Sequence, residues 1–119
     1  MNTAFKIDFQ QQNIRARIPS GSEISGTSKF GSGLLVQGKL SGVTHVEGVM
    51  VVLEDGVVEG VVVTGGDTYI MGHVKAERLE VHGVLYVGDG GSVSGYVLAQ
   101  DYQLFAGADI KGSLHKFSK

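Results

Sequence analysis

Four histidines are the side chains best suited to metal chemistry in this chain: His45, His73, His82 and His115. A zinc site needs three ligands that converge on one point. The first three histidines each stand beside an apolar residue in an alternating stretch, so we expect them to point outward at separate places. Because the chain has no cysteine, a cysteine-ligated metal and a thiol nucleophile are excluded. We therefore expect no metal and no cofactor, although a histidine site shared between subunits stays open.

Two glycine-rich stretches that contain an aspartate, at 65–67 and 88–91, have the composition of phosphate- or calcium-binding loops. Neither leads into a helix, and neither has the spacing of a phosphate- or dinucleotide-binding loop. Glycine and aspartate are also common corner residues of β structures. No serine or threonine has an obvious base partner, so the sequence predicts a protein that is not an enzyme.

Length and composition indicate one folded domain. The chain has 119 residues, of which 42% are hydrophobic, 18% are charged and 19 are glycine. That hydrophobic share is too high for a disordered linker. The longest purely apolar run, 49–53, is too short for a transmembrane helix. Residues 1–20 and 110–119 are net basic and residues 40–74 are net acidic, which argues against a nucleic-acid groove across the body.

One short motif recurs: an apolar residue, any residue, glycine, any residue, and a second apolar residue. Its copies lie at 36–40, 46–50, 58–62, 70–74, 81–85, 93–97 and 110–114. This period of two is typical of strands, and it turns both apolar side chains of a copy to the same side. The side chains expected to face inward are Val36, Leu40, Val46, Met50, Val58, Val62, Ile70, Val74, Val81, Leu85, Val93, Val97, Ile110 and Leu114.

The glycines also form three interleaved columns. The first contains Gly21, Gly38, Gly56, Gly72, Gly90 and Gly107, with steps of 16 to 18 residues. The third contains Gly42, Gly60, Gly95 and Gly112, and in it Glu77 takes the place of a missing glycine. A common step describes a coil with three short strands and three corners per turn.

The sequence thus predicts an all-β fold, a single-domain parallel β-helix (solenoid) of triangular section. We expect five to six turns over residues 21–115, with a flexible N-terminal tail at 1–20 and a short C-terminal tail at 116–119. The uneven step favours a right-handed coil. A small antiparallel sandwich is the alternative, but it gives no reason for the common step.

Apolar residues also stand at positions that the alternation turns outward. Val49, Val51, Val61 and Val63 are expected to be exposed, and if contiguous they form a lateral interface with another protein. An ordinary β surface carries such residues as well, and both interpretations stay open.

The ends of such a coil expose unpaired backbone groups that template another chain. The sequence shows no capping helix at either end. Apolar residues at the last turn predict stacking of one coil on another, and stacked coils that still expose their ends form a filament. The expected polymerisation residues are Leu104, Phe105, Ile110 and Phe117.

The N-terminal segment has its own alternation. Phe5, Ile7 and Phe9 are separated by Lys6 and Asp8. These apolar side chains are candidates for membrane contact with help from nearby basic residues. A strand that covers the first turn of the coil is the alternative.

The uncapped Gly/Val coil with flanking tails resembles the bactofilins over roughly residues 20–115. The most similar stretches lie at 38–42, 46–50 and 108–114. The resemblance implies a bacterial cytoskeletal protein with a right-handed β-helix, which polymerises without nucleotide through its terminal turns. It also implies a cytoplasmic location, attachment to the inner membrane surface by the N-terminal tail, and partners in cell-shape or cell-wall machinery.

Two other functions stay open at this point. One is an enzyme built on a hexapeptide coil, of the carbonic-anhydrase or acyltransferase kind. The other is a binding module that forms a closed oligomer. Filaments that form without added nucleotide would favour the polymerising cytoskeletal protein over both of these functions.

Overall fold

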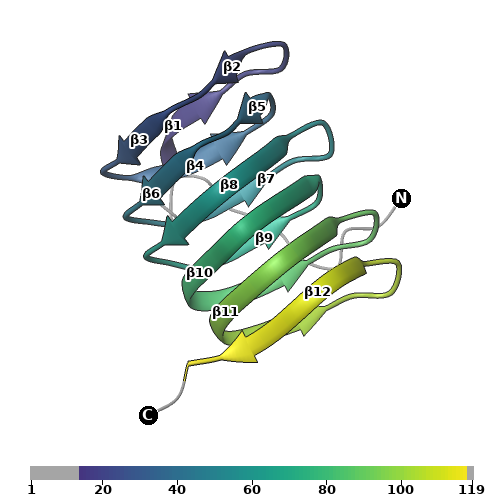
Figure 1. The fold of residues 1–119 in the computed structure, drawn as a ribbon. Helices are drawn as coiled ribbons and strands as arrows, with labels where there is room; N and C mark the ends of the chain where they lie inside the picture. Colours follow the sequence, from purple (N-terminus) through teal and green to yellow (C-terminus); the bar gives the residue numbers. More distant parts are fainter. Residues whose placement is uncertain (1–13, 118–119) are drawn as a thin grey trace.

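Parallel strands wind into a coil in the computed structural model, which describes residues 14–117 (Figure 1). No helix occurs in this range. The strands, in chain order, are β1 (Ile14–Ile18), β2 (Glu23–Ile24), β3 (Thr27–Phe30), β4 (Gly33–Val36), β5 (Lys39–Leu40), β6 (Val43–Val46), β7 (Met50–Val52), β8 (Val57–Thr64), β9 (Thr68–Ile70), β10 (His73–Val87), β11 (Ser92–Leu104) and β12 (Asp109–Lys116).

Three faces make up the wall of the coil, and every strand pairing is parallel. Face A contains β1, β4, β7, β9 and the last parts of β10 and β11. Face B contains β2, β5 and the first parts of β8, β10, β11 and β12. Face C contains β3, β6, the second half of β8, the middle of β10 and β11, and the end of β12. The described residues complete about six turns, which confirms the predicted triangular β-helix. Its right-handed sense stays a prediction.

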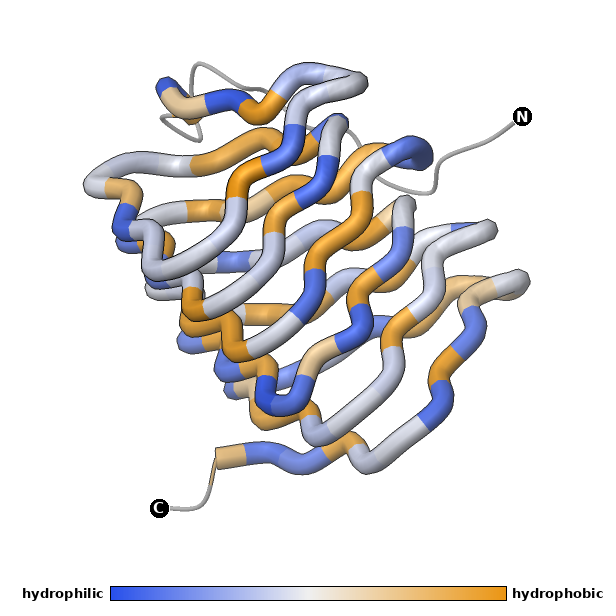
Figure 2. Tube along the Cα trace, turned by 45° about the horizontal axis from the view of Figure 1, so that its top comes forward, coloured by the Kyte–Doolittle hydropathy of each residue, from blue (hydrophilic) through white to orange (hydrophobic). Residues whose placement is uncertain are grey.

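Apolar residues recur at matching positions from turn to turn and fill the inside (Figure 2). On face B one inward column runs through Ile24, Leu40, Val58, Val74, Val93 and Ile110. Every side chain predicted to face inward is buried except Ile110 and Leu114. Those two are half-buried because they belong to the last turn, where no further turn covers them.

Glycine lines the corner between faces B and C because the turns approach each other closely there. Gly42 and Gly60 have φ angles of +99° and +100°, a conformation that residues with a Cβ rarely adopt. A Cβ at Gly60 would also collide with the carbonyl oxygen of Gly42 in the turn before it. The corner therefore requires glycine for its φ angle and for its space.

One turn lacks this glycine and contains an extra residue instead. Ala76 pairs with Gly60 on one side and Gly95 on the other, and the register shifts between Ala76 and Arg78. Glu77 was expected in the glycine column, but the structure places Ala76 there and leaves Glu77 as a bulge. Because alanine does not readily take a positive φ, the chain rounds this corner with one more residue.

The first strand of the coil begins before the predicted domain boundary. β1 lies in the range expected as a tail, yet it pairs with β4 from Ile14 to Ile18. Ala16 and Ile18 face the core on either side of the exposed Arg17, which is the period of a strand, whereas the register shifts after Ile14, which packs on the outer side of face A. Ile18 is 1% exposed and belongs to the core. β1 therefore adds one more strand to face A, ahead of the predicted start of the coil.

Replacing Gly60 with alanine tests the corner. We expect Gly60→Ala to lower the free energy of unfolding by roughly 2 to 4 kcal/mol, because the substitution adds backbone strain and a steric clash. Thermal or urea denaturation followed by circular dichroism measures the change. Gly31→Ala is the matched control, since a Cβ at Gly31 has no atom within 4 Å. Equal loss of stability in both variants would contradict this account of the corner.

Candidate interaction surfaces

The C-terminal end of the coil exposes the edge of its last strand and the end of its core. Among the described strands, β12 pairs with β11 alone, so its outer backbone edge has no strand beside it. Leu104 pairs with Val87, which is fully buried, but Leu104 itself is 41% exposed. With the half-buried Ile110 and Leu114, it gives this end an apolar centre.

The N-terminal end is open in the same way. In residues 14–117, each strand of the first turn has a single partner: β4 for β1, β5 for β2 and β6 for β3. Ile24 is 36% exposed, while Leu40 directly beneath it in the same column is fully buried. Both ends of the coil thus present a strand edge next to unfinished apolar columns.

The structure separates the two phenylalanines that were expected at the polymerisation end. Phe105 follows β11 at a corner of the last turn, where its N–H donates to the Val87 carbonyl at 3.0 Å. Phe117 follows β12, and its ring stacks on the His82 ring with centroids 4.9 Å apart. Leu104, Phe105 and Ile110 therefore lie in the last turn, whereas the Phe117 ring packs on a residue from an earlier turn.

The four valines expected as one lateral surface lie on two faces. Val51 belongs to face A and Val49 to the corner before it, while Val61 and Val63 belong to face C. The expected exposure is wrong for Val51, which is 0% exposed, and the other three are half-buried. They do not form one contiguous patch, because successive strands of a turn face different directions.

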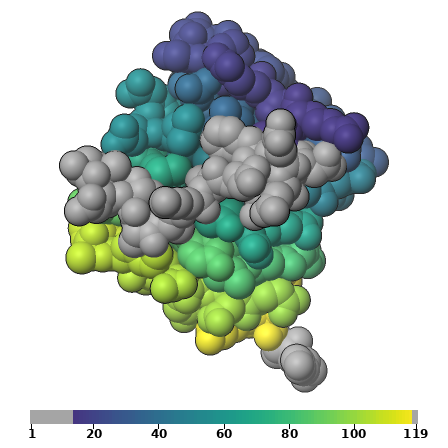
Figure 3. All heavy atoms as spheres, turned by 180° about the vertical axis from the view of Figure 1, so that it is seen from behind, coloured from purple at the N-terminus to yellow at the C-terminus, as the bar shows by residue number. Residues whose placement is uncertain are grey.

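Face A instead carries an apolar column that we call the outer strip: Leu35, Val51, Tyr69 and Tyr86. These side chains pair in register across four turns, on the outer side of the sheet. Ile14, Val49, Leu53 and Met71 pack against the strip. Figure 3 shows the coil from behind, with its turns in chain order from purple to yellow. Leu35 escaped the sequence reasoning because the unbroken apolar run Leu34–Val36 hides which residue points outward.

The two tyrosines of the outer strip stack on each other. The ring centroids of Tyr69 and Tyr86 are 4.7 Å apart, with planes 6° from parallel. Burial, followed by the nearby Asp67 carboxylate and Tyr86, raises the pKa of the Tyr69 hydroxyl above its ordinary value of 10.0. Each of these causes disfavours the charged phenolate.

Face C carries a mixed surface of rings and charges. The rings of Tyr96 and His115 stack at 4.8 Å, and the Arg78 guanidinium lies 5.4 Å from the centre of the Tyr96 ring. Arg78 also pairs with Glu80, whose second oxygen lies 3.7 Å from His82 Nε2. The contacts of Tyr96 join neighbouring turns, whereas the two contacts of Glu80 lie within β10.

The histidines are distributed over separate positions. His45 and His115 stand on face C, His73 begins β10 on face B, and His82 stands at a corner. Within residues 14–117 no group of three His, Cys, Asp or Glu side chains is arranged to hold a metal ion.

The glycine loops form corners of the coil. In the first loop the Asp67 Oδ1 atom accepts a hydrogen bond from the Val84 N–H of the next turn at 2.9 Å. In the second loop the Gly91 N–H donates to the Gly88 carbonyl at 2.9 Å, and Gly90 has a φ of +86°. The Asp67 carboxylate thus links two successive turns by a hydrogen bond, as expected of an aspartate at a corner of a β structure.

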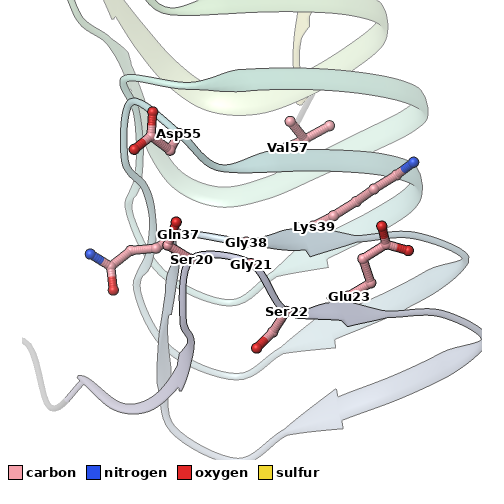
Figure 4. Close-up of a pocket in the computed structure, with 9 residues that line it drawn as sticks. All are labelled: Ser20, Gly21, Ser22, Glu23, Gln37, Gly38, Lys39, Asp55 and Val57. Carbon is pink, nitrogen blue, oxygen red and sulfur yellow. The ribbon is translucent and has the colours of Figure 1, made fainter.

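An open polar hollow lies at the corner between faces A and B, near the first turn (Figure 4). Its lining residues are Ser20, Gly21, Ser22, Glu23, Gln37, Gly38, Lys39, Asp55 and Val57. In the described part of the chain the Gln37 Oε1 atom is buried without a hydrogen-bond partner. The hollow combines acidic and basic groups, with no convergent set of ligands.

The membrane-contact candidates Phe5, Ile7 and Phe9 lie outside the described residues. Between Ile14 and Phe117 no helix is long and apolar enough to cross a membrane.

The raised pKa of Tyr69 has a measurable consequence. In the folded state the neutral phenol is favoured, so its stabilising contribution is present below pH 10 and is lost as pH rises through the raised pKa. The difference between the alkaline absorbance titrations of wild type and Tyr69→Phe should therefore have its midpoint above pH 10. A midpoint at or below that value would show that the strip does not desolvate this hydroxyl.

Comparison with known proteins adds one match. The bactofilin family model, described as polymer-forming cytoskeletal, matches residues 16–115. No curated protein and no solved structure matches the chain. The matched residues cover β2 to β11 completely, the last three residues of β1 and all of β12 but its last residue, so they reach both open ends and all three faces. With its parallel coil of about six turns, the chain belongs to the bactofilins, a structural family of polymer-forming cytoskeletal proteins.

Proposed function

We propose that this protein is a non-enzymatic scaffold whose terminal turns stack end to end into filaments, without nucleotide. The observation that carries the proposal is the open state of both ends. Ile24 and Leu104 stand at the ends of apolar columns whose inner members are buried, and each stands beside an unpaired strand edge within residues 14–117. A second coil placed on either end would continue the sheets and the core together.

The contact at such a joint consists mainly of apolar side chains and of hydrogen bonds between backbone groups. Buried apolar surface contributes roughly 25 cal/mol per Å², and pairing of the strand edges satisfies backbone groups. The charges of the last turn already pair locally, with Lys116 Nζ 3.1 Å from Asp101 and Lys111 Nζ 3.9 Å from Asp109. Salt, which screens exposed charges, should therefore leave the joint intact.

Membrane linkage is the second part of the proposal. Phe5, Ile7 and Phe9 supply apolar side chains, and the exposed Arg15 and Arg17 of β1 supply positive charge next to them. This combination suits a surface of anionic lipid, where each basic residue adds about 1 kcal/mol. Such a filament would position cell-shape or cell-wall machinery at the inner face of the membrane.

A charge at the end of the core tests end stacking. We expect Leu104→Arg to abolish filaments in electron microscopy while the β signal of circular dichroism persists, because Leu104 is already 41% exposed. Gln103→Arg is the matched control, since Gln103 is exposed and pairs with the outward Tyr86. It should leave filaments unchanged.

The size of the Leu104→Arg species reports how the ends meet. Dimers in solution indicate that two N-terminal ends join each other, and monomers indicate that each joint uses one end of each kind. Filaments of Leu104→Arg that look like wild type would reject this stacking site. A fixed small oligomer of the wild type would favour the closed binding module instead.

Deletion of residues 1–12 tests membrane linkage. In flotation with vesicles that contain anionic lipid, the deleted chain should lose binding and still form filaments. The loss follows from removal of Phe5, Ile7 and Phe9. Equal flotation before and after the deletion would reject the anchor and leave end stacking untouched.

A further inference from the structure

One inward column of face C ends in a charged residue. Its members pair in register from turn to turn, in the order Phe30, Val46, Thr64, Val81, Ala99 and Lys116. The four inner members are fully buried, and the first packs against the core. Only the last member carries a charge. At the C-terminal end of the coil, this core column therefore ends in the ammonium group of Lys116.

The Lys116 ammonium group is fixed by two neighbours at the open end of the core. Its Nζ atom lies 3.1 Å from the Asp101 carboxylate and 5.5 Å from the centre of the Tyr102 ring. Tyr102 pairs with the buried Leu85 and packs against the core. The hydrogen bond from the Tyr102 N–H and the nearby Lys116 hold the pKa of the Asp101 carboxyl below its ordinary value of 3.8, so the pair stays ionised at neutral pH. A positive charge thus stands beside the apolar centre of this end.

The inward residues of the opposite end carry no charge in the described part of the chain. Within residues 14–117, the inward positions of the first turn hold Ala16, Ile18, Ile24, Ser28 and Phe30. A copy that approaches the N-terminal end therefore meets apolar and small polar side chains. A copy that approaches the C-terminal end has to take an ammonium group out of water.

We propose that Lys116 is a guard residue that limits stacking at the C-terminal end of the coil. The inference rests on the proposed end-to-end stacking and names what regulates it. An inward-pointing charge is one of the devices that keep open strand edges from pairing indiscriminately. Burial of the ammonium group in a joint costs more free energy than its pair with the exposed Asp101 returns, because both charges lose water. The C-terminal joint is therefore weaker than a fully apolar end would make it.

Replacement of the guard by an unbranched apolar side chain tests the proposal. The critical concentration for filaments is measured by sedimentation of the polymer over a series of protein concentrations. We expect Lys116→Met to lower it about tenfold or more, because the core column then ends in an apolar side chain. Lys116→Arg keeps the charge and should stay near wild type. Lys111→Met is the matched control, since it removes an exposed charge from the outer side of the same strand.

The outcomes separate the guard from the stacking itself. If filaments form, the guard is overturned by a critical concentration of Lys116→Met at or above that of wild type. An equal decrease in Lys116→Arg or in Lys111→Met overturns it as well. If wild type forms no filaments at any concentration, the proposed end stacking fails. The guard then holds only if Lys116→Met self-associates in light scattering where wild type does not, and it is rejected if both remain monomers.

Discussion

Hydrogen bonding between successive turns is the constraint on which this structure depends. Each described strand pairs with strands of the turn before it or after it, and all of these pairings are parallel. A turn therefore has to repeat the shape of the turn below it, corner by corner. Gly42 and Gly60 make that repetition possible, because any larger residue would meet a carbonyl oxygen of the preceding turn. The same constraint leaves both ends of the coil with unpaired strand edges within residues 14–117.

Stacking in register also determines what the sides of the coil look like. A residue on the outside of one strand lies beside the equivalent residue of the next turn, so similar residues add up to columns. On face A this produces the apolar outer strip, whereas face B carries mostly charged and small polar side chains. The open ends of the coil and the apolar outer strip are thus separate surfaces.

The inside of the coil was largely predictable, because the repeated motif marks inward residues on both sides of a glycine. The prediction was weakest where apolar residues follow one another without a break. In the run 49–53 the alternation gives Val51 an outward direction, which is right, but the side chain is 0% exposed although an exposed one was expected. Leu34 and Val52 are buried core residues that the motif does not include. The bulge at Glu77 was hidden because both it and Ala76 lack the glycine signal.

The sequence by itself determined the coil, its step of about one turn per 16 to 18 residues, its inward side chains and its lack of caps within 14–117. These properties are local, because period-two alternation and corner glycines act within a single turn. Only the tertiary structure decided which outward residues become neighbours. Val51 and Val61 are ten residues apart but stand on different faces, while Tyr69 and Tyr86 are seventeen apart and stack. The face of a residue depends on the summed lengths of all strands and corners before it, and one bulge shifts that sum.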